Sequence, residues 1–217
     1  MTELLLAMDT ATDAPSLALG SPTEPGADVR IPSRRDLSRD IETVVRQLLA
    51  ARGMAPGDLA GVVVADGPGS FTGLRIGIAF AKGLCRASGR PLLTAPSLLG
   101  AALAACGGRG TVLVEYDALR GDVYRAVYRF GGDAAAHAGA AASGVGVLAA
   151  PALVPRGAPP PVFPGLLRAD ATHASAASLL RLHHVGGGLA VVPAPDPWEP
   201  AYGRLAEAEV RRLARQR

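Results

Sequence analysis

Hydrophobic positions in the first half of the chain alternate between short apolar runs and helical spacing. The runs, which are typical of buried strands, lie at 4–8, 16–20, 62–65 and 91–94, with a weaker one at 29–31. Between them, apolar residues recur every three or four positions and predict helices over 36–52, 72–86 and 97–106. This order predicts an α/β fold with a mixed sheet.

The second half is less regular. Apolar runs at 111–117 and 123–128 flank the turn 118–121 and predict a hairpin. Residues 131–164 are rich in Ala, Gly and Pro, and no element is predicted there. A helix over 174–184, a short strand over 189–192 and a last helix holding Leu205, Val210 and Leu213 complete the pattern. No internal repeat is visible.

A change of pattern at Gly107 and Gly108 predicts a subdomain boundary. We therefore expect an N-terminal block of residues 1–107 and a smaller C-terminal block of residues 108–217. Whether the last helix packs back on the first block is left open.

Composition narrows the class of protein. With 217 residues, 49% of them hydrophobic, the chain can bury a sizeable core, yet no apolar run approaches the ~18–20 residues of a membrane span. The N-terminus lacks a basic leader, and Cys85 and Cys106 lie in apolar helical segments, which favours a cytoplasmic protein with reduced thiols. The net charge is only +3 and the arginines are scattered, so composition does not indicate a nucleic-acid surface.

A glycine-rich stretch, residues 66–77, links a predicted strand to the helix 72–86. Its glycine spacing fits neither the Walker loop nor the dinucleotide-binding fingerprint. The helix that follows has a second apolar face, formed by Ile76, Phe80 and Leu84, in addition to the face that covers its own sheet. Along its margin runs a row of small residues, Gly69, Gly73 and Gly77, which permits close approach of another helix, either of the same domain or of another subunit.

Candidate chemistry is sparse. Asp9 ends the first strand, where actin-like and sugar-kinase-like ATPases place an acid that holds a metal-bound nucleotide. Because the turn after it lacks glycine, Asp9, Thr10 and Thr12 form either a vestigial nucleotide site or a capped turn. No histidine pair has metal-ligand spacing and no nucleophile elbow occurs, so we predict no metal, no cofactor and no catalytic set.

Five segments together resemble the bacterial TsaB (YeaZ) family. They are 5–11, 67–77 with 81–84, 91–98, 117–124 and 199–204. The resemblance implies an actin-like (ASKHA) fold with two ribonuclease-H-like subdomains of mixed sheets, the second one reduced. One departure is Asp36-Leu37-Ser38, where many members have His-Ser-Glu at the start of the first helix.

The resemblance also implies a function. Such a protein is a non-catalytic scaffold or activator in the formation of N6-threonylcarbamoyladenosine beside the tRNA anticodon. It pairs with the homologous TsaD, works with TsaE, meets tRNA indirectly through the complex, and forms a homodimer when alone. The alternative is a small actin-like ATP-dependent phosphotransferase that uses Asp9.

The helices 36–52 and 72–86 are then the predicted pairing elements. Their expected interface residues are Leu37, Ile41, Val45, Gly69, Phe71, Gly73, Leu74, Ile76, Gly77, Phe80 and Leu84.

Overall fold

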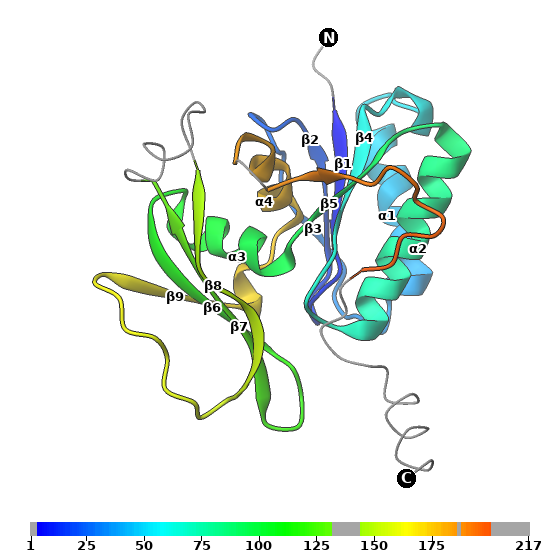
Figure 1. Cartoon of the computed structure of the whole chain (residues 1–217). Helices are drawn as coiled ribbons and strands as arrows, with labels where there is room; N and C mark the ends of the chain where they lie inside the picture. Colours follow the sequence, from blue (N-terminus) through cyan, green and yellow to red (C-terminus); the bar gives the residue numbers. More distant parts are fainter. Residues whose placement is uncertain (1–3, 132–143, 186–187, 201–217) are drawn as a thin grey trace.

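Two β-sheets organise the chain, and helices lie on both faces of the larger one (Figure 1). The computed structural model describes residues 4–131, 144–185 and 188–200. Within these ranges, no helix combines the length and hydropathy that crossing a bilayer requires. The last predicted helix, with Leu205, Val210 and Leu213, lies outside them.

The larger sheet, sheet A, has six strands in the order β10-β5-β4-β1-β2-β3. Their bounds are β1 Leu5–Asp9, β2 Ser16–Gly20, β3 Val29–Arg30, β4 Gly61–Ala65, β5 Leu92–Ala95 and β10 Ala190–Val191. β1 pairs antiparallel with β2 and parallel with β4, and β4 pairs parallel with β5. Every residue of β1, β2 and β4 is buried, because helices cover both faces. The apolar runs therefore predicted this sheet correctly.

In the described part of the chain, four α-helices lie on the faces of sheet A. α1 (Leu37–Ala50) and α2 (Phe71–Ser88) lie side by side on one face, while α3 (Ser97–Cys106) and α4 (Ala176–Arg181) lie between the two sheets (Figure 1). Short 3-10 turns occupy Pro56–Asp58, Ala171–His173 and Leu182–His184. Ser70 caps α2, because its hydroxyl oxygen accepts a hydrogen bond from the Gly73 amide, and Gly89 ends α2 in the left-handed conformation that glycine adopts readily.

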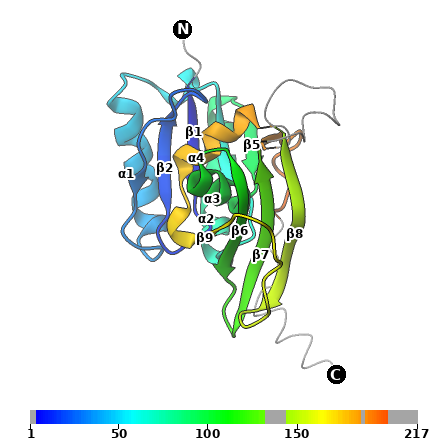
Figure 2. The same ribbon diagram turned by 90° about the vertical axis from the view of Figure 1, so that its left-hand side faces the viewer.

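The smaller sheet, sheet B, has four strands in the order β8-β7-β6-β9. Their bounds are β6 Gly110–Asp117, β7 Asp122–Phe130, β8 Val145–Pro155 and β9 Leu166–Asp170. The predicted hairpin is confirmed by β6 and β7, whereas β8 lies wholly within residues 131–164, where no element was predicted. Figure 2 shows β8 at an edge of sheet B, on the opposite side of the molecule from α1.

The two sheets share one strand plan, although no sequence repeat is visible. In each, three antiparallel strands follow one another, and a fourth then pairs parallel with the first: β4 with β1, and β9 with β6. The segment after β9 returns to sheet A, since α4 packs on β1 and β2 and β10 pairs with β5. Sheet A therefore includes residues from both predicted blocks.

Candidate functional site

Partly exposed apolar side chains lie on α1 and α2, on the outer side of sheet A. On α2 they are Ile76, Phe80 and Leu84, which helical geometry places on one face; on α1 they are Val44 and Leu48. All five pack against the core and are only half-buried. We call these five residues the outer strip. This row of half-buried apolar side chains on two helices offers a surface against which another protein could pack.

Other predicted interface residues face inward. Leu37, Ile41 and Val45 of α1 and Leu74 of α2 are at most 4% exposed and belong to the chain's own core. The helical spacing correctly placed them on an apolar face, but that face covers sheet A. Only Phe71, Ile76, Phe80 and Leu84 of the predicted set have half-buried side chains.

The glycine row has a partner within the chain. A Cβ added to Gly73 would lie 2.1 Å from the Thr10 carbonyl oxygen, and one added to Gly77 would lie 2.3 Å from the Thr10 hydroxyl oxygen. One added to Gly69 would lie 2.5 Å from the Ala11 carbonyl oxygen. The prediction that these three glycines admit a neighbouring helix is wrong, because they admit the connection between β1 and β2. That contact presses α2 onto the end of β1.

The start of α2 is further fixed by polar contacts to that same connection. The Ser70 amide donates to the Ala11 carbonyl at 2.7 Å, and Arg34 donates to the Ser70 hydroxyl at 2.7 Å. The Arg34 guanidinium also lies 3.2 Å from Asp13. The β1–β2 connection is therefore a structural clamp on the helix that carries most of the outer strip.

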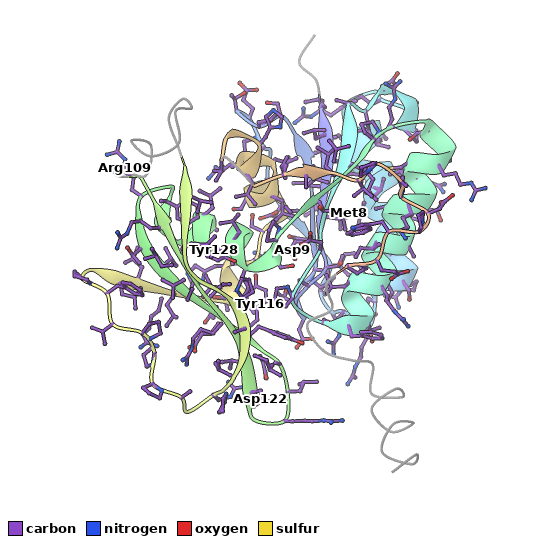
Figure 3. The ribbon with its side chains drawn as sticks, viewed as in Figure 1. Met8, Asp9, Arg109, Tyr116, Asp122 and Tyr128 are labelled. Carbon is purple, nitrogen blue, oxygen red and sulfur yellow. The ribbon has the colours of Figure 1, made fainter. Side chains whose placement is uncertain are left out.

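The predicted nucleotide residues do not converge. Thr10 faces α2, as its contact with Gly77 shows, whereas Asp9 lies on the side of sheet A that faces sheet B (Figure 3). Asp9 Oδ1 accepts a hydrogen bond from the Ala11 amide at 3.1 Å, which is the capped turn. Among the described residues, Asp9 Oδ2, Thr10 Oγ1 and Thr12 Oγ1 are buried and have no hydrogen-bond partner. Because α2 fills the space beside Thr10, the turn does not form a phosphate cradle.

Burial dominates the electrostatics on the Asp9 side. Burial raises the pKa of Asp9 to about 6, against the opposing effect of the Ala11 hydrogen bond. Burial likewise raises the pKa of Asp66 to about 6, although a hydrogen bond from Thr94 opposes it. Tyr116 and Tyr128 lie opposite on sheet B (Figure 3), and burial raises the pKa of both phenols above their ordinary values.

Three other candidates among the described residues, Asp117, Cys85 and metal-ligand clusters, do not add a reactive centre to these acids. Asp117, which ends β6, is an exposed turn residue that accepts from the Leu119 amide and pairs with Arg156 at 2.8 Å. Cys85 is a buried free thiol, and burial raises its pKa to about 11, so it is a poor nucleophile. In the described part of the chain, no three His, Cys, Asp or Glu side chains come together as metal ligands.

A further contact of α2, on the side away from Ile76, Phe80 and Leu84, was missed by sequence reasoning. Residues 193–200, which we call the C-terminal strap, run beside α2 (Figure 1). The ammonium of Lys82 donates to the carbonyl oxygens of Asp196, at 3.3 Å, and Trp198, at 2.5 Å, and lies 5.7 Å from the centre of the Trp198 ring. The sequence feature that could have drawn attention to this contact is that the chain has one lysine and one tryptophan, and these two residues meet here.

Comparison with known proteins agrees with this architecture. Residues 31–154 match the family model described as TsaD, tRNA N6-adenosine threonylcarbamoyltransferase. The chain is 36% identical over 127 residues to the tRNA threonylcarbamoyladenosine biosynthesis protein TsaB of Escherichia coli (strain K12), covering 58% of this chain and 54% of that protein. It is also 36% identical over 128 residues to TsaB of Bacillus subtilis (strain 168), covering 58% and 55%. The chain belongs to the TsaB (YeaZ) family.

A solved structure from Pseudomonas aeruginosa extends the comparison of this TsaB-family chain to nearly its whole length. That protein, described as similar to peptidase YEAZ, superposes with a TM-score of 0.70 at 25% identity, over 94% of this chain and 100% of that one. In sequence, the chain spans about half the length of the two TsaB relatives. Both relatives are named as biosynthesis proteins and not as transferases.

Proposed function

We propose that this TsaB-family chain is a non-catalytic scaffold or activator in the formation of N6-threonylcarbamoyladenosine in tRNA. The observation that carries the proposal is the outer strip, a partly exposed apolar surface on helices that the core and the β1–β2 connection hold in place. The absence of a convergent reactive set among the described residues fits the same role, as do the names of the TsaB relatives.

The partner is TsaD, paired through the outer strip. The match of residues 31–154 to a model named for TsaD supports common ancestry, and homologous chains carry equivalent helices that can meet face to face in a pseudo-symmetric pair. TsaE completes the assembly, tRNA is reached indirectly through the complex, and the complex works in the cytoplasm. Without TsaD, the same strip forms a homodimer.

The fold that we propose for this chain is actin-like (ASKHA), with two ribonuclease-H-like subdomains. It is supported by the shared plan of three antiparallel strands and a fourth parallel to the first in both sheets. The second subdomain is reduced, since sheet B has four strands where sheet A has six. The subdomains divide at Gly107 and Gly108, after which α4 and β10 return to sheet A.

A phosphotransferase that uses Asp9 is the alternative function. The buried, half-satisfied Asp9 carboxyl is the feature in its favour. Against it, Thr10 is pressed onto α2 and leaves no cradle for phosphates. Calorimetry separates the two functions: magnesium-dependent ATP binding by the chain alone supports the phosphotransferase, and its absence supports the scaffold.

Reconstitution tests the scaffold directly. Threonylcarbamoyl transfer to tRNA by TsaD and TsaE from the same organism is measured with and without this chain, and we expect transfer to rise when the chain is added. Phe80→Asp places a charge in the outer strip and should weaken pairing with TsaD at least about thirty-fold, the range of an interface hot spot. Ala104→Asp, at an exposed position of α3 on the other face of sheet A, is the control and should pair normally. Unchanged transfer on adding the chain would contradict the proposal.

A further inference from the structure

α2 is held from two sides. On one side, α1 lies next to Ile76, Phe80 and Leu84. Lys82 lies about 200° around the helix axis from Phe80, on the opposite side of α2, and there it contacts the C-terminal strap. The strap is itself anchored at both ends. β10 pairs with β5 and the Val192 amide donates to the Leu92 carbonyl at 2.9 Å, while Trp198 packs against the core and Pro200 is buried.

Lys82 connects α2 to the strap through polar contacts. Its ammonium serves two backbone carbonyls and one aromatic face, and these charge-assisted contacts are the strong kind. Arg86 also forms an ion pair with Asp196 of the strap at 3.8 Å, and this pair is largely exposed on both sides and contributes little. Removing the Lys82 ammonium should therefore loosen the strap and weaken its support of α2 on the side away from α1, while the core and the β1–β2 connection still hold the helix on sheet A.

We infer that Lys82 is a positioning residue for partner docking, acting through the C-terminal strap on the outer strip. The inference rests on the proposed pairing with TsaD. A partner that presses into the outer strip pushes α2 toward the strap, and the latched strap keeps Ile76, Phe80 and Leu84 at their spacing from α1. Because coupling between two sites is reciprocal, bound TsaD must in turn tighten the contact between Lys82 and the strap.

A double-mutant cycle tests the route. Lys82→Met keeps the apolar stem and removes the ammonium, and it should weaken pairing with TsaD about two- to thirty-fold and shift Trp198 emission to the red. Lys82→Arg, which can still donate to carbonyls, should restore most of the affinity. Trp198→Ala loosens the strap by another means, and the pair Lys82→Met and Trp198→Ala together should lose no more than one alone. Arg90→Met, an exposed charge loss after α2, should leave pairing unchanged.

The reciprocal effect is read on Lys82 itself. Since it is the chain's one lysine, its acetylation by an N-hydroxysuccinimide ester can be followed by peptide mass spectrometry. We expect saturating TsaD to slow that acetylation in the wild type and to slow it much less in Trp198→Ala.

Additive losses in the cycle would overturn the inference, because Lys82 would then act by touching the partner and not through the strap. Normal pairing of Lys82→Met, in a chain whose Trp198 emission has shifted, would overturn it as well while leaving the proposed function intact. If the wild-type chain itself fails to pair with TsaD, the proposed function falls and the inference with it.

Discussion

Sheet A and sheet B share a strand plan but differ in how completely they are covered. The inner strands β1, β2 and β4 of sheet A are buried along their whole length, and its exposed edge strands β3 and β10 have only two residues each. The inner strands of sheet B are also mostly buried, but this sheet ends in the longer edge strands β8 and β9, which are mostly exposed or half-buried. Cover on both faces gives sheet A a rigid core on which α1 and α2 can present the outer strip. The shared plan therefore does not imply a shared role, because the layers around each sheet decide which half can carry a docking surface.

The acids that end the equivalent strands β1 and β6 show the same difference. Asp9 is buried and only half-satisfied, while Asp117 is exposed and paired with Arg156. Because a buried carboxylate is unfavourable, the ionised Asp9 side chain lowers the stability of the fold at neutral pH. Asp117 organises a turn and changes the stability of the fold little. Four substitutions test how far the two halves differ, and they are given in order of expected effect.

The largest effect is expected at the clamp on α2. Gly73→Ala places a methyl group 2.1 Å from the Thr10 carbonyl, a backbone atom that cannot move freely, and should destabilise the fold by about 3 kcal/mol or more. Urea unfolding measures the change. Gly83→Ala on the same helix, where nothing lies within 4 Å, is the control and should stabilise by about 0.5–1 kcal/mol. Equal effects at the two glycines would contradict the clamp.

A change of similar size but opposite sign is expected at Asp9. The pKa of Asp9 in the folded chain, about 6, lies above the ordinary value of 3.8. The stability that the protonated Asp9 carboxyl contributes is therefore fully present below about pH 4 and is lost as the pH rises through 6. At pH 7.5 this loss is about 3 kcal/mol. Asp9→Asn should therefore stabilise the chain at pH 7.5 by up to about 3 kcal/mol and have little effect at pH 4.

Thermal unfolding of wild type and Asp9→Asn across pH 4–8 measures that difference. Asp66→Asn should act in the same direction but more weakly, because Asp66 is partly exposed and hydrogen-bonded to Thr94. A stability gain that does not depend on pH would rule out the carboxyl ionisation as the cause.

A smaller loss is expected in sheet B at Arg125. Its buried guanidinium pairs with Glu115 at 2.7 Å and donates hydrogen bonds to the carbonyls of Ala158 and Pro159. These two hydrogen bonds fix the connection between β8 and β9 to β7. Arg125→Met leaves these acceptors without their donor and should cost about 1–3 kcal/mol by urea unfolding. Arg129→Met, which removes one bond to Thr111, should cost less. A larger loss at Arg129 would contradict the assigned role of Arg125.

The smallest effect is expected on β8. Val147 is 57% exposed, and Val147→Thr keeps the β-branched shape, so the free energy of unfolding should change by less than about 0.5 kcal/mol. Val63→Thr in β4, where the side chain is fully buried, is the contrasting variant and should be clearly destabilising. Comparable losses at both positions would remove the distinction between the sheets.

Much of sheet A could be predicted from the sequence because most of its strands are short, mainly apolar runs. β8 could not, since its Ala, Gly and Pro residues give neither a large apolar side chain at alternate positions nor a helical period. For α2, periodicity identified both apolar faces, but the partner of Gly73 and Gly77 is Thr10, more than sixty residues earlier in the chain. Periodicity shows that a face must be covered and does not show which segment covers it.

The exposed edge of β8 has a consequence for handling the protein. Its eleven residues carry no charge, and no strand among the described residues pairs with its outer side. Natural sheets protect such an edge with charges, prolines or bulges, because unpaired backbone groups on apolar strands recruit other strands. β8 has Pro151, Pro155 and an irregular register against β7, but no charge. We therefore expect self-association in concentrated solutions to begin in the part of β8 before Pro151, and a lysine at Leu148, which is 37% exposed, to reduce it without altering the fold.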